Sequence, residues 1–194
     1  MPRLRTGLLV LTLGVGFAAV LAGAALTVGV QREAAVTPAA VEKPKFAEVK
    51  WPFPMDQWGR GRAFQCAAAD CGIEVTVYVR AKIGFCNCDS GVSDDAELDR
   101  VGDMELYSQK FVGIADGRTI KVGWMEGRSR PYRADIAYVG QRTAQVIAFN
   151  EQCDVIVATV VTRSDRLGDA ERLALVFLNG DIVLNWARAE LGAA

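Results

Sequence analysis

The sequence predicts an α+β protein in which one N-terminal transmembrane helix precedes a single antiparallel-sheet domain with two or three helices, stapled by disulfides. Three observations lead to this prediction. Apolar stretches joined by short turns come before the helical patterns, an order typical of α+β domains. A long uncharged segment lies near the N-terminus, and four of the five cysteines fall within 23 residues.

The N-terminal segment is long enough to anchor the chain in a membrane. No charged side chain occurs between Thr6 and Val30, and these 25 residues would form a helix of about 37 Å, more than the ~30 Å hydrocarbon layer. Arg3 and Arg5 precede it, which keeps the N-terminus in the cytoplasm and exports the rest. Small residues near its end also allow a cleaved signal peptide. We expect residues 1–30 to anchor a single-pass bacterial inner-membrane protein with its domain in the periplasm, or to act as a signal sequence whose cleavage releases the domain there.

The sequence predicts a linker at residues 31–45 and a single domain at residues 46–194. The linker holds Pro38 and Pro44 and lacks an apolar period. Of the 22 basic and 23 acidic side chains, five and two fall in residues 1–45, which leaves the domain 17 and 21, a net charge of −4. Nucleic acid is therefore not an expected partner, because binding it requires a basic face.

The chain contains no histidine, which removes several classes of mechanism. Nucleophile pairs that depend on histidine and metal sites that it would ligate are excluded. Phosphate-binding glycine loops and nucleophile elbows are also missing from the sequence. We therefore expect a non-catalytic protein with no cofactor and no metal.

Alternating apolar residues make Ile73–Arg80 the clearest strand, half-buried with its valines on one face. Asp116-Gly117 predicts a hairpin turn between Gln109–Ala115 and Arg118–Met125. A second hairpin is expected between Arg142–Phe149 and Val155–Val161. The last of these strands is apolar almost throughout, so it should be central and covered on both faces.

Helix signals occur at two places. Ser93-Asp94-Asp95 begins a short helix, with Glu97 completing a capping box. Asp169 is expected to cap a helix to Leu178, where Asn179-Gly180 supplies a left-handed stop. Residues 182–191 fit a further helix face, although 182–186 also fit a short strand.

The cysteines are the first candidate site. Cys66, Cys71, Cys86 and Cys88 flank the strand 73–80, and in an oxidising compartment such clustering indicates disulfides. Bonds from 66/71 to 86/88 would staple the entry of the strand to the loop after it, although sequence alone leaves the connectivity open. Cys153 is read as a buried free thiol, with an alternative pairing or an intermolecular bond also open.

The same four cysteines support a competing hypothesis, in which the protein handles thiols, disulfides or a metal through them. Their spacing matches no common zinc or iron–sulfur pattern. Acidic residues from Asp94 to Asp103 are read as helix capping rather than as a cation site.

Two further groups are candidates for binding. Trp51 and Trp58 flank prolines, and we expect their segment to pack its rings onto the core, with an exposed aromatic platform as the alternative. Arg128, Arg130 and Arg133 lie on a predicted loop, which either binds an anion or is simply solvated. The leading prediction is an accessory, assembly or binding protein that holds a protein partner at or in the inner membrane. An anion- or glycan-binding domain is a weaker alternative.

Overall fold

A computed structural model describes residues 43–136 and 140–192. The predicted anchor at residues 1–30 and nearly all of the predicted linker lie outside these ranges. Within the ranges described, no helix combines the length and the apolar character needed to cross a membrane.

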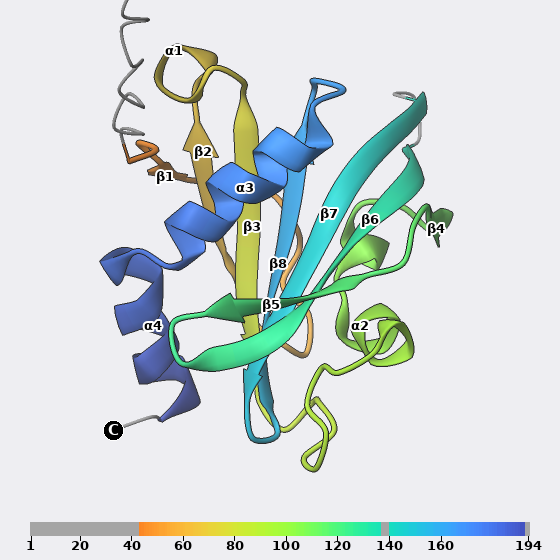
Figure 1. The fold of residues 1–194 in the computed structure, drawn as a ribbon, viewed down its shortest axis with the longest axis vertical. Coiled ribbons are helices and arrows are strands. Elements are labelled where there is room, and N and C mark those ends of the chain that lie inside the picture. The colour runs from red at the N-terminus through yellow and green to blue at the C-terminus, as the bar shows by residue number, and fades with distance from the viewer. Residues whose placement is uncertain (1–42, 137–139, 193–194) are drawn as a thin grey trace, which may run out of the picture. The chain divides into compact units, whose positions relative to one another are not determined.

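The described residues form one eight-stranded sheet in which every pairing is antiparallel. Its order is β1-β2-β3-β8-β7-β6-β4, and β5 also pairs with β6 (Figure 1). The strands are β1 (Ala47–Val49), β2 (Arg62–Cys66), β3 (Val75–Lys82), β4 (Phe111–Gly113), β5 (Arg118–Val122), β6 (Met125–Ile136), β7 (Gly140–Glu151) and β8 (Asp154–Thr162). The helices are α1 (Ala68–Cys71), α2 (Asp95–Val101), the 3₁₀ helix η1 (Met104–Leu106), α3 (Leu167–Leu178) and α4 (Asp181–Leu191).

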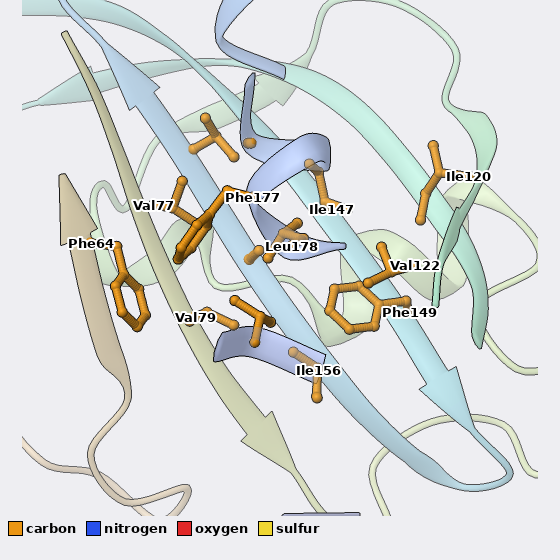
Figure 2. Packing of buried hydrophobic residues seen from close by; sticks show 14 of the residues in the cluster. Phe64, Val77, Val79, Ile120, Val122, Ile147, Phe149, Ile156, Phe177 and Leu178 are labelled. Carbon is orange, nitrogen blue, oxygen red and sulfur yellow. The ribbon is translucent and has the colours of Figure 1, made fainter. Parts of the chain in front are cut away.

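One face of the sheet packs against α3 and α4 and carries the larger core (Figure 1, Figure 2). Alternation along β3 turns Val75, Val77 and Val79 toward these helices, as the sequence predicted, and all three are fully buried. Phe177 and Leu178 of α3 fill the space above them.

The opposite face carries a second core under α2 and η1. Leu98 and Val101 of α2 and Met104 of η1 pack there against alternate residues of β7 and β8. The strand β8 is therefore central and covered on both faces, which confirms the expectation for residues 155–161.

The predicted hairpin around Asp116-Gly117 is wrong. Both β4 and β5 pair with β6 instead of with each other, so they follow one another along one edge of the sheet. The real hairpin turn is Gly123-Trp124, between paired residues Val122 and Met125, where Gly123 adopts a φ of 58° that glycine tolerates. The hairpin of β7 and β8 is confirmed.

The helix predictions hold except at the ends of α3 and in the capping box of α2, where the Glu97 carboxylate accepts from the Asn87 main-chain nitrogen and from Arg100 instead of from Asp94. Asp94 caps α2 and accepts a 2.8 Å hydrogen bond from the Glu97 main-chain nitrogen. Helix α3 begins at Leu167, before Asp169, which lies in its first turn. It ends at Leu178, and the capping residue Asn179 has a φ of −82°, not a left-handed one. Residues 182–191 belong to α4, not to a strand.

Candidate functional site

The structure forms two disulfides, and neither joins the pairs expected from sequence. Cys66 bonds to Cys71, and Cys88 bonds to Cys153. The predicted staple from 66/71 to 86/88 is wrong because β3 separates these cysteines. Eight residues of strand span about 27 Å, whereas the Cα atoms of a disulfide lie about 6 Å apart.

Cys153 is therefore bonded, and Cys86 is the buried free thiol among the described cysteines. Cys153 lies in the two-residue turn between β7 and β8, beside Gln152, whose φ is 50°. The bond ties this turn to the loop after β3. The Cys86 main-chain nitrogen also donates to the Cys153 oxygen at 3.0 Å, so the loop and turn are held together twice.

Cys86 does not have the surroundings of a reactive thiol. Its side chain is buried, and its sulfur donates to the Gln152 main-chain oxygen at 3.2 Å. Burial, with the negative charges of Glu97 and Asp154, raises the pKa of Cys86 to about 11. An attacking thiol requires a lowered pKa and access to solvent. These features argue against Cys86 as the nucleophile of a thiol–disulfide enzyme.

We predict that native Cys86 is nearly inert to iodoacetamide at pH 8. A pKa near 11 in place of 9.0 leaves about 100-fold less thiolate, before burial slows the reaction further. The unfolded thiol ionises near pH 9 and the folded one near pH 11, so this group lowers the free energy of unfolding as pH rises between them. Timed alkylation of Cys86 with and without urea compares the reactivity of the folded and unfolded protein. Equal rates would contradict the prediction that the folded thiol is nearly inert.

Trp51 and Trp58 both lie against the sheet, which agrees with the packing interpretation. Trp51 is 8% exposed and rests on Gly61, where an added Cβ would come within 2.6 Å of its ring. Phe53 and Tyr78 pack edge-on against it. Trp58 is half-buried against Phe85, so the two tryptophans do not form one exposed platform.

Beneath this aromatic segment (residues 51–58) lies a buried cluster of charges that the sequence did not reveal. Arg80 donates two hydrogen bonds to Asp103, at 2.6 and 2.7 Å, and two to Asp56, at 2.7 and 2.8 Å. The Lys82 ammonium lies 2.8 Å from Asp103 and 2.6 Å from the Val101 oxygen. The side chains of Arg80, Lys82 and Asp103 are at most 6% exposed.

A cavity of about 360 Å³ opens beside the cluster, under Trp58 and Phe85. Burial lowers the pKa of Lys82 despite the nearby Asp103. A lysine with a lowered pKa is by itself a candidate for chemistry. Its ammonium is nevertheless engaged by a carboxylate and a main-chain oxygen. The arrangement therefore fixes the aromatic segment and the end of α2 to β3 rather than presenting an unoccupied amine.

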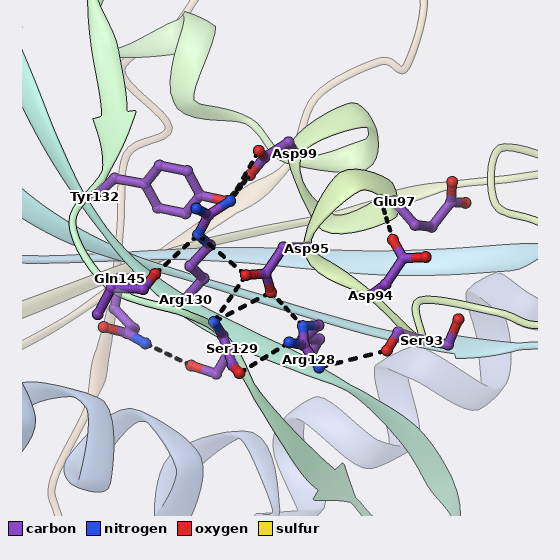
Figure 3. A network of polar contacts seen from close by, with 12 residues as sticks. Ser93, Asp94, Asp95, Glu97, Asp99, Arg128, Ser129, Arg130, Tyr132 and Gln145 are labelled. Atoms are coloured by element: carbon purple, nitrogen blue, oxygen red, sulfur yellow. Dashed lines mark hydrogen bonds and ion pairs between the residues drawn. The ribbon is translucent and has the colours of Figure 1, made fainter.

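Arg128 and Arg130 lie on strand β6, not on the predicted loop, and face α2 (Figure 3). Arg128 pairs with Asp95, and Arg130 donates to Asp99 at 2.9 and 3.0 Å. The Tyr132 hydroxyl also donates to Asp99. The acidic helix and the basic strand thus neutralise each other, which explains the acidic run without a cation.

Arg133 is not part of that group. Alternation along β6 turns it to the opposite face, opposite Thr143 of β7. The three arginines therefore do not form one anion site. Within residues 43–136 and 140–192, no cluster of three cysteine or acidic side chains is arranged to hold a metal ion.

Sequence reasoning missed the charge cluster because Arg80 and Lys82 occupy the polar face of an alternating strand, which resembles a solvated face. The aromatic segment, predicted to pack on the core, was the one signal that this face is covered.

No known protein family and no curated protein matches this chain.

Proposed function

We propose that this chain is a non-catalytic binding protein, held at a bacterial inner membrane by its N-terminal segment, whose periplasmic domain docks a protein partner. The two disulfides suggest an oxidising, extracytoplasmic environment. The cysteines and the buried lysine are engaged in holding the fold, which favours binding over chemistry.

The observation that carries the proposal is the exposed edge strand β4. In the described part of the chain it pairs only with β6, so alternate main-chain donors and acceptors face outward. No charged side chain occurs within Phe111 to Ala115, although natural edges are usually protected by charge; Arg130 of the neighbouring strand lies against Gly113 and donates to the Ala115 oxygen at 3.0 Å. Val112 is 57% exposed and Ile114 is 40% exposed.

The side chains of Val112 and Ile114 lie on the face of the sheet on which α3 packs, but α3 covers other strands of that face. Val112 pairs with Arg133, and the Ile114 nitrogen donates to Pro131, whereas α3 packs on β3, β7 and β8. An extended segment of a partner would satisfy the open edge by adding a strand, and its apolar side chains would cover Val112 and Ile114. Confinement at a membrane would raise the effective concentration of the two proteins.

The test is the recovery of a partner with full-length protein extracted from native membranes in mild detergent. Val112→Lys should reduce recovery at least about tenfold, because a buried lysine ammonium opposes docking. Ile182→Lys in α4 is the matched control, since Ile182 is also 57% exposed. Both variants should keep the melting temperature of the parent.

Loss of partner in both variants alike, or a monomeric parent that turns over a substrate, would contradict this function.

A further inference from the structure

A groove on the α2 face of the sheet has the features of a small-ligand site. Strand β7 pairs with β6 up to Gly140 but with β8 only up to Ala144, so the ends of β6 and β7 diverge from β8 (Figure 1). A cavity of about 290 Å³ lies in this opening, and an adjoining hollow of about 430 Å³ shares Arg142 and Arg163 with it. Ligand pockets usually start near 300 Å³.

The floor of this groove is apolar and aromatic. It is lined by Tyr78, Met104, Tyr107 and Val161, together with two alanines of β6 and β7. Flat aromatic groups pack well against tyrosine rings, and a methionine sulfur adds a favourable contact at a ring edge.

Arginines outnumber carboxylates along the groove and its adjoining hollow, in a domain whose net charge is −4: the lining holds Arg133, Arg142 and Arg163 against Glu74 and Asp165. Arg142 donates to its neighbour Gln141, and no described carboxylate lies within ion-pair distance of it. Arg163 is 87% exposed, and its one ion-pair partner among the described residues, Glu74, is 3.7 Å away. Two guanidinium groups are thus placed to bind a carboxylate or similar anion.

One buried hydroxyl in the lining of the groove, that of Tyr107, lacks a hydrogen-bond partner of ordinary geometry in the described part of the chain and lies beside Tyr78. Burial and then the adjacent Tyr78 raise the pKa of Tyr107 well above its usual range, so the group remains a donor. A buried hydroxyl of this kind is uncommon and requires an explanation.

We infer that the groove binds a small organic anion with a flat aromatic body, whose ring lies on Tyr78 and Tyr107 and whose anionic group meets Arg142 and Arg163. The proposal is independent of the protein partner. Ala134 and Ala144 of the groove lie on the opposite face of the sheet from Val112.

The test is calorimetric titration of the full chain in neutral detergent with 2-naphthoate and with its uncharged analogue 2-naphthol. Naphthoate should bind saturably and at least about tenfold more tightly, and added salt should weaken only naphthoate. Arg142→Gln with Arg163→Gln should weaken naphthoate about tenfold and leave naphthol unchanged. Partitioning into micelles is common to all variants, so differences between variants report the groove.

Arg172→Gln on α3 is the control for lost charge, since Arg172 is exposed and pairs with Asp169. Thr76→Trp should fill the groove and abolish binding of both probes, while Thr119→Trp on β5 should not. Tyr107→Phe should retain the melting temperature of the parent and weaken the binding of naphthoate.

Equal affinity for the two probes, no saturable binding, or the same loss in Arg172→Gln would overturn the inference. Partner recovery should be unchanged in the groove variants, so failure here and failure of the docking function are distinguishable.

Discussion

Removing the Cys88–Cys153 bond should cost about 4 kcal/mol of unfolding free energy, against about 2 kcal/mol for Cys66–Cys71. The first bond closes a loop with a sequence separation of 65 and the second one of only 5. A longer loop loses more entropy from the unfolded chain when it is closed. Urea unfolding of the full chain in neutral detergent compares Cys88→Ala/Cys153→Ala with Cys66→Ala/Cys71→Ala.

Cys86→Ala is the control, because it removes a buried sulfur without opening a loop. It should cost less than either double variant if cross-linking is the source of the effect. A larger loss for the short loop than for the long one would contradict the assignment of Cys88–Cys153 as the principal staple.

Asp103→Asn should destabilise the domain by about 3–5 kcal/mol, the usual cost of removing one partner of a buried ion pair. Asp103 alone bridges Arg80 and Lys82, and all three side chains are nearly inaccessible to water. Its loss leaves Lys82 with main-chain oxygens only, in a place where burial already lowers its pKa. Thermal and urea unfolding measure the change.

Adding Lys82→Met to Asp103→Asn should recover part of the loss, because it removes one unneutralised cation. Glu48→Gln is the matched control: Glu48 lies 2.6 Å from Arg62 but is 52% exposed, and exposed pairs contribute at most about 1 kcal/mol. If Asp103→Asn changes stability no more than Glu48→Gln, the cluster does not hold the aromatic segment in place.

The elements with strong local patterns could be predicted from sequence. Strict alternation located β3, a continuous apolar run identified β8 as central, and a capping sequence beginning at Asp94 located α2. The segment around Trp51 was expected to pack on the core, and it does. These features depend on residues close together in the chain, so their signals survive without knowledge of the tertiary fold.

The remaining features depend on long-range register. Asp116-Gly117 is a good turn sequence, but the strands on either side of it, β4 and β5, both pair with β6 and not with each other. Gly127–Tyr132 appeared to be a loop because of its glycine, proline and arginines, yet acidic α2 neutralises that strand. Cys153 could be assigned to Cys88 only once the turn after β7 was placed beside the loop after β3.

The most direct test is the state of the five cysteines in living cells. Whole cells are alkylated without reductant, and the protein is then digested and analysed by mass spectrometry. Linked peptides for 66/71 and 88/153, with a label on Cys86 appearing only after denaturation, are the result we expect. Five reduced thiols, or a mixed disulfide through Cys86, would contradict an exported domain in which sulfur serves only to hold the fold.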